Sequence, residues 1–144
     1  MKSLKFFALF FFLGLFVLET TSCNKQNKVN EQYLGEYNGT IGYPNPQDPI
    51  QTIYEDGATL LVEKQSKNKY KMSSPTHPDH FPETVYVINK LLSNVDTAGQ
   101  VGIEEGQLGS TGTFVFSDDA DSTYIFVSRG DVDMQVIFTG SKPN

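Results

Sequence analysis

Cysteine and histidine are both scarce in this sequence: one Cys and two His occur among 144 residues. A single cysteine excludes an internal disulfide and a cysteine-rich zinc site. Basic residues are also few, because 11 Lys and Arg stand against 17 Asp and Glu, which gives a formal net charge of −6. Neutralising phosphates requires a basic face, so we expect no nucleic-acid partner.

Only one long apolar run is present, Phe6–Leu18, and it follows Lys2 and Lys5. As a helix its 13 residues would span about 20 Å, short of the roughly 30 Å hydrocarbon core of a bilayer. A charged start, a short apolar run and small residues after it are typical of a secretory signal peptide. We therefore expect residues 1–22 to be removed on export.

The only cysteine, Cys23, directly follows the small residues Thr20, Thr21 and Ser22. This arrangement resembles the lipobox of bacterial lipoproteins. The resemblance implies cleavage before Cys23, a diacylglycerol in thioether linkage to its sulfur, and a fatty acid such as palmitate on the new N-terminus. A single acyl chain binds membranes only marginally, so several chains are needed for a stable lipid anchor.

Residues 23–32 are expected to form the lipidated cysteine and a flexible tether, because 24–32 (NKQNKVNEQ) contain one apolar residue. No acidic cluster follows Cys23, which favours the periplasmic face of the cell outer membrane over surface display. Residues 33–144 are then the only folded domain.

The body lacks the sustained helical repeat of apolar residues, although a helical turn is expected around Lys90–Ser93. From Cys23 onward, 27 Val, Ile and Thr outnumber 11 Leu, Ala and Met, and branched side chains favour strands. The expected strands are Tyr33–Tyr43, Ala58–Lys64, Lys69–Ser73, Thr84–Asn89, Gly99–Glu105, Gly112–Ser117, Thr123–Arg129 and Val132–Thr139.

Turn signals separate these segments. Gln65–Asn68 indicates a hairpin, and the acidic run Asp118–Asp121 indicates another turn. Pro44–Pro49 and Ser74–Pro82 are rich in proline and are expected to be the two long loops. About eight strands at this spacing predict an all-β barrel or sandwich.

Two short motifs resemble small lipocalin-like lipoproteins of Gram-negative bacteria: Tyr33-Leu-Gly-Glu-Tyr37-Asn-Gly39 at the start, and Val136-Ile-Phe138-Thr-Gly140-Ser-Lys142 at the end. The resemblance implies an antiparallel meander of about eight strands in a closed or nearly closed barrel. A barrel of eight strands either holds one small ligand or is filled by side chains.

Residues suited to catalysis or metal binding are sparse. His77 and His80 share one loop with Asp79, which is too few ligands for a firm metal site. Glu104 and Glu105 are neighbours in a strand and should point to opposite faces. Nucleophile-elbow and phosphate-loop motifs are absent. We expect no enzyme, no cofactor and no bound metal.

Two charged clusters favour structural interpretations. Asp118, Asp119 and Asp121 lack the spacing of a calcium-binding EF-hand and suit a hairpin turn. Lys67, Lys69 and Lys71 alternate, so they should lie on one solvated strand face.

Two functions remain open. The first is a module that binds a small apolar or amphipathic ligand inside the barrel. The second is a structural or adaptor lipoprotein that contacts another envelope protein and holds no internal ligand. The candidate cavity residues for the first function are Tyr37, Tyr43, Phe114, Phe116, Tyr124, Phe126 and Phe138.

Overall fold

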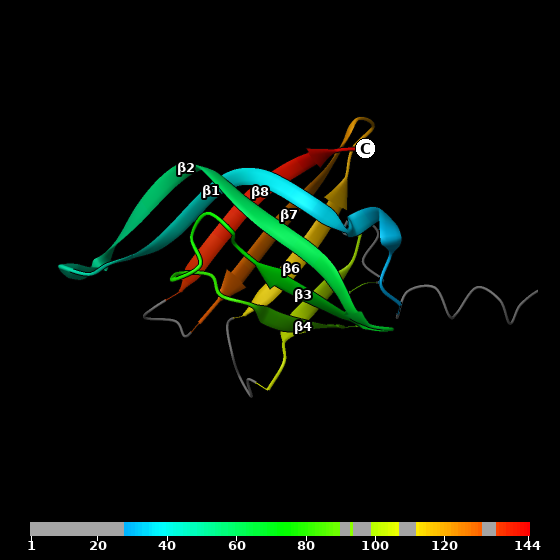
Figure 1. The fold of residues 1–144 in the computed structure, drawn as a ribbon, viewed down its shortest axis with the longest axis horizontal. Coiled ribbons are helices and arrows are strands. Elements are labelled where there is room, and N and C mark those ends of the chain that lie inside the picture. The colour runs from blue at the N-terminus through cyan, green and yellow to red at the C-terminus, as the bar shows by residue number, and fades with distance from the viewer. Residues whose placement is uncertain (1–27, 90–92, 94–98, 107–111, 131–134) are drawn as a thin grey trace, which may run out of the picture.

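A computed structural model describes residues 28–89, 93, 99–106, 112–130 and 135–144. Eight antiparallel strands follow one another around a closed barrel, and β8 returns to pair with β1 (Figure 1). This confirms the predicted all-β, lipocalin-like meander. The elements are the 3-10 helix η1 (Glu31–Tyr33) and the strands β1 (Gly35–Asn45), β2 (Asp48–Ser66), β3 (Lys69–Ser73), β4 (Thr84–Ile88), β5 (Val101–Glu104), β6 (Thr113–Asp118), β7 (Ser122–Arg129) and β8 (Val136–Pro143).

In the short strands, side chains alternate between the inside and the outside of the barrel, as they do in any β-strand. In β3, Tyr70 and Met72 point inward and are fully buried. Lys69 and Lys71 point outward, where Lys69 pairs with Glu105, and Lys71 Nζ lies 2.9 Å from Glu63 Oε2. Two lysines of the predicted row thus form an ion-paired outer face, while Lys67 lies in the turn before β3.

The β1–β8 seam closes the barrel between strands from opposite ends of the chain. Its register runs from Asn38 opposite Ser141 to Gly42 opposite Ile137. Gly39 faces Gly140 in the middle of the seam, and a Cβ on Gly140 would lie 2.7 Å from the Asn38 carbonyl oxygen. Two glycines therefore allow the backbones to approach closely here.

The N-terminal boundary differs from the prediction, because part of the expected tether is docked. Val29 is buried, and its N–H donates to the Lys67 carbonyl at 2.8 Å. Asn30 caps η1, and its backbone N–H donates to the Tyr70 hydroxyl at 2.9 Å. The one apolar residue of the segment 24–32 thus secures its C-terminal part against the barrel.

The prediction of a long loop at Pro44–Pro49 is wrong, because these residues form the tip of a long hairpin. Pro44 lies in β1 and Pro49 in β2. Strand β8 pairs with β1 only as far as Gly42, and β3 pairs with β2 only from Leu61 onward. Each strand of the tip therefore has a free edge, where prolines are tolerated. The other expected loop, Ser74–Pro82, is confirmed.

The hairpin leaves the barrel as a two-stranded extension, which we call the arm (residues 43–57; Figure 1). At its base a bulge lets Thr40 pair with Asp56 and Gly39 with Ala58, so that Gly57 is the extra residue. Gly57 adopts a φ of +77°, which a residue with a side chain rarely does. The bulge changes which β2 side chains share the inner face with Ile41 and Tyr43.

Some predictions fall on residues outside the description: the signal peptide, Cys23, the turn residue Asp131, the start of the expected strand Val132–Thr139, and 90–92 of the expected helical turn. At the end of that turn, the Ser93 N–H donates to the Asn89 carbonyl at 3.0 Å. This is the spacing of an α-helical hydrogen bond.

Candidate functional site

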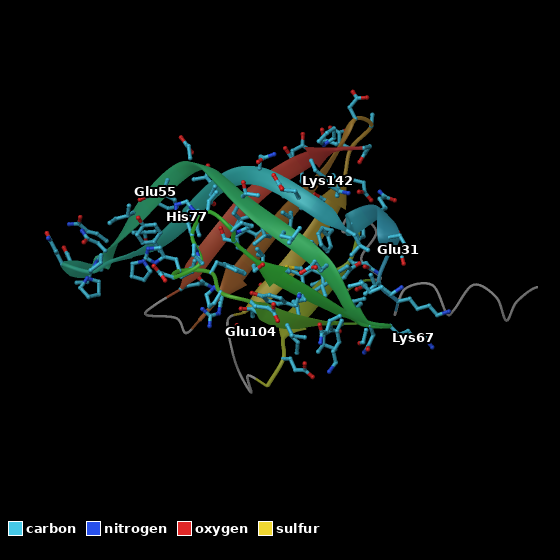
Figure 2. The ribbon with its side chains drawn as sticks, in the orientation of Figure 1. Glu31, Glu55, Lys67, His77, Glu104 and Lys142 are labelled. Atoms are coloured by element: carbon cyan, nitrogen blue, oxygen red, sulfur yellow. The ribbon has the colours of Figure 1, made fainter. Side chains whose placement is uncertain are left out.

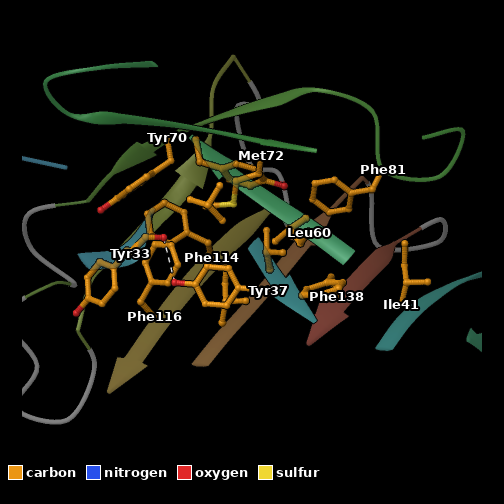
Figure 3. Packing of buried hydrophobic residues seen from close by; sticks show 14 of the residues in the cluster. Tyr33, Tyr37, Ile41, Leu60, Tyr70, Met72, Phe81, Phe114, Phe116 and Phe138 are labelled. Atoms are coloured by element: carbon orange, nitrogen blue, oxygen red, sulfur yellow. Dashed lines mark hydrogen bonds between the residues drawn. The ribbon is translucent and has the colours of Figure 1, made fainter. Parts of the chain in front are cut away.

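Four of the seven candidate cavity residues lie inside the barrel and are fully buried: Tyr37, Phe114, Phe116 and Phe138. They fill the interior rather than line an open space (Figure 3). The Phe116 ring stacks on Tyr33 with centroids 4.4 Å apart, and it meets the ring of Tyr70 at 5.3 Å. Such offset and edge contacts are typical of a packed aromatic core.

The interior tyrosine hydroxyls are bonded to the protein itself. Tyr37 donates to the Tyr33 carbonyl at 3.0 Å, and Tyr86 donates to the Ser128 carbonyl at 2.9 Å. Tyr70 bonds to the Gln100 side chain. Burial raises the pKa of Tyr37, Tyr70 and Tyr86, so all three remain neutral. These hydroxyls hold the core together and are not directed at a ligand.

The prediction that Tyr124 and Phe126 point into the barrel is wrong. Both are on the outside of β7, with 45% and 40% of their surface exposed, while Ile125 and Val127 point inward. The segment Thr123–Val127 (TYIFV) offers bulky apolar residues on both faces. Alternation alone therefore does not say which set enters the core.

Tyr43 lies at the base of the arm, not in the barrel cavity. Its ring stacks on the His80 imidazole with centroids 3.7 Å apart, and its hydroxyl donates to Glu55. His80 belongs to the loop between β3 and β4, so this contact joins that loop to the inner face of the arm.

His77 completes the same cluster, which we call the brace (Tyr43, Glu55, Thr76, His77 and His80). Its Nε2 lies 2.8 Å from Glu55 Oε2, and its Nδ1 lies 2.9 Å from Thr76 Oγ1 (Figure 2). The hydrogen bond from Tyr43 and then that of His77 lower the pKa of Glu55. Glu55 is therefore a carboxylate at neutral pH.

The order hydroxyl, imidazole, carboxylate also occurs in hydrolase triads. Here the Thr76 hydroxyl oxygen accepts the Thr59 backbone N–H at 2.9 Å, and Ser74 Oγ donates to the Thr59 carbonyl at 2.7 Å. Both side chains thus cover the edge of β2, and the arrangement fixes the loop to the arm. In the part of the chain that the structure describes, no cluster of three or more His, Cys, Asp or Glu is suited to a metal ion.

The arm carries the two most exposed large apolar side chains of the described residues. Ile50 is 95% exposed and Tyr54 is 67% exposed. The sequence of 43–57 (YPNPQDPIQTIYEDG) contains three acidic residues and no Lys or Arg. Sequence reasoning missed this surface because its prolines indicated an irregular loop.

A shallow groove of about 500 Å³ crosses the outer face of β6, β7, β8 and β1. Tyr124 and Phe126 are its aromatic residues, and Val115 lies beside Phe126 in the register. This groove was also missed, since it depends on the outward orientation of Tyr124 and Phe126.

Two of the acidic candidates, Asp118 and Glu105, have structural partners. Asp118 accepts hydrogen bonds from Tyr33 at 2.8 Å and from Thr123 at 3.0 Å. Glu104 is buried, whereas Glu105 pairs with Lys69 outside, so the prediction of opposite faces is confirmed. Neither cluster forms a paired-carboxylate site.

No helix among the described residues is long and apolar enough to cross a membrane. No known protein family, no curated protein and no solved structure matches the chain. Its function is therefore inferred from its own fold and surface.

Proposed function

We propose that this chain is a lipid-anchored, non-enzymatic adaptor of the bacterial outer membrane that faces the periplasm and contacts another envelope protein through the arm. The observation that carries the proposal is the arm itself: a braced, two-stranded extension with Ile50 exposed near its tip and Tyr54 exposed near its base. The lipid anchor at Cys23 is inferred from the sequence.

The position of the arm relative to the anchor supports an adaptor. Strand β2 spans 19 residues, from the tip of the arm to the turn at Lys67. Val29 is bonded to that turn, so the chain leads toward Cys23 from the end of the barrel remote from the arm (Figures 1 and 2). A protein anchored at Cys23 would extend its arm away from the membrane.

The brace supports binding because it prepares the arm in advance. An isolated two-stranded hairpin is marginally stable in water. The contacts of Glu55 with Tyr43 and His77 hold this hairpin against the β3–β4 loop. A preorganised surface loses less conformational entropy when a partner binds.

The composition of the arm indicates the kind of partner. Ile50 and Tyr54 offer apolar anchors, and Asp48 and Asp56 share their strand parity and add negative charge to the same face. A basic protein surface with an apolar pocket is complementary to this arm. The packed aromatic interior favours this adaptor over a carrier of an internal ligand.

Site-specific photo-crosslinking in the native host tests the proposal. A photoreactive residue at Ile50 should give a discrete protein adduct in membranes, and Tyr54→Ala should weaken it. The control position is Gln65, an exposed residue near the end of β2 at the opposite end of the barrel. Equal adducts at both positions would contradict an arm-specific partner. A small molecule retained by the protein in native mass spectrometry would favour the carrier instead.

A further inference from the structure

Two aromatic side chains of β7 lie in the outer groove, two positions apart along the strand. Residues two apart in a strand point to the same face and lie about 6.6 Å apart. Tyr124 and Phe126 occupy such positions, and each keeps more than half of its surface against its neighbours. Together they offer a continuous aromatic platform on the outside of the barrel.

Hydroxyl and amide groups flank this platform in register. Tyr124 lies opposite Ser117 of β6 on one side and Ser141 of β8 on the other. Ser141 in turn lies opposite Asn38 of β1. Phe126 lies opposite Thr139. The two aromatic rings of β7 therefore have hydrogen-bonding groups on both sides, from β6 on one side and from β8 and β1 on the other.

The flanking groups are available to a ligand. Within the residues that the structure describes, the side-chain hydroxyls of Ser117, Thr139 and Ser141 have no protein partner. Asn38 uses only its Oδ1, which accepts a long hydrogen bond of 3.4 Å from Thr59. Its amide N–H groups remain free to donate.

The groove has no charge. None of its described lining residues is Asp, Glu, Lys, Arg or His, although 28 residues of the whole chain (11 basic and 17 acidic) are charged. An ionic ligand would find no counter-charge here. The complementary ligand is neutral, with an apolar face for the rings and hydroxyl groups along its edges.

We propose that this groove binds a neutral polysaccharide made of hexose rings. The apolar faces of two sugar rings stack on Tyr124 and Phe126. Their hydroxyl groups exchange hydrogen bonds with Ser117, Ser141 and Asn38. This glycan site is separate from the arm, so the protein can hold a polysaccharide and a protein partner at once.

Calorimetric titration of the full chain in detergent tests the proposal with maltohexaose, cellohexaose and chitohexaose. At least one of these neutral hexasaccharides should bind. Tyr124→Ala and Phe126→Ala should each weaken that binding at least about tenfold, which corresponds to about 1.4 kcal/mol. Tyr124→Phe keeps the ring and should retain most of the affinity.

Two controls distinguish sugar binding in the groove from binding elsewhere on the protein. Tyr54→Ala removes an exposed ring from the arm and should leave sugar binding unchanged, while a hyaluronan hexasaccharide, which is anionic, should not bind. The proposal is wrong if none of the three neutral sugars binds, or if the alanine variants bind as the native chain does. It is also wrong if Tyr124→Ala abolishes a protein adduct without changing sugar affinity.

Discussion

His77 and Glu55 are 22 positions apart in the sequence, and their Nε2 and Oε2 atoms lie 2.8 Å apart at the base of the arm. This contact, the Tyr43–His80 stack and a tilted ring contact between Tyr43 and His77 join the arm to the β3–β4 loop. They turn a hairpin with two free edges into a defined part of the surface.

Removing the Glu55 charge should loosen the arm and leave the barrel intact. In Glu55→Gln, amide hydrogen exchange of residues 52–56 should become several-fold faster, because the hydrogen bonds with Tyr43 and His77 weaken. Exchange in β7 should not change. Glu36→Gln removes a carboxylate from the exposed face of β1 and is the matched control. Equal exchange in the native chain and Glu55→Gln would show that the brace does not hold the arm.

Acid should loosen the arm in the same way. The contacts of Glu55 lower its pKa from the ordinary value of 4.5. Its stabilising contribution is therefore complete above about pH 4.5 and is lost as the pH falls through the lower pKa of the folded protein. Exchange at 52–56, measured relative to β7, should rise over that acidic range. Glu55→Gln should lack this rise.

Replacing a phenylalanine inside the barrel by alanine should lower the free energy of unfolding far more than the same replacement outside it. Phe116→Ala removes a fully buried ring and should destabilise the fold by about 3–5 kcal/mol. Phe126→Ala, on the adjacent strand, removes an exposed ring and should cost about 0.5 kcal/mol. Urea unfolding monitored by circular dichroism measures both. Similar losses for the two variants would contradict the assignment of inner and outer faces.

The proposed lipid anchor has a direct chemical test. Cys23→Ala removes the only thiol and should abolish incorporation of radioactive palmitate in the bacterial host. Ser22→Ala keeps a small residue before the cysteine and should still be labelled. Labelling that persists in Cys23→Ala would refute the anchor.

The sequence predicted the order of the eight strands and the central residues of each, because each has a local period of two and turn residues beside it. It missed the first ten residues of β2, and it placed the end of the last strand at Thr139 instead of Pro143. In β4, for example, Thr84, Tyr86 and Ile88 alternate with outward residues as expected. The two main errors depend on the partners of a strand. The sequence predicts a loop where the arm lies, because local sequence does not reveal that the pairing of β8 with β1 ends at Gly42. Beyond Gly42 the edge of β1 is free, and Pro44 is tolerated there.

The candidate site was predicted less well for a similar reason. Phe114, Phe116 and Phe138 were correctly placed on the inner face. Tyr124 and Phe126 were not, because the hydrophobic effect does not distinguish them from Ile125 and Val127 in a strand that is apolar on both faces. The brace depends on contacts between segments that are distant in sequence, so no local pattern predicts it.

The β1–β8 seam has a consequence for the order of folding. Seven of the eight strand pairings join sequence neighbours and are able to form while later strands are still unpaired. The eighth must wait for β8, whose last residue is Pro143. Until then β1 and β7 have open edges, the condition in which strands pair with other molecules. Loss of β8, by nonsense mutation or proteolysis, would leave both edges open for the life of the molecule.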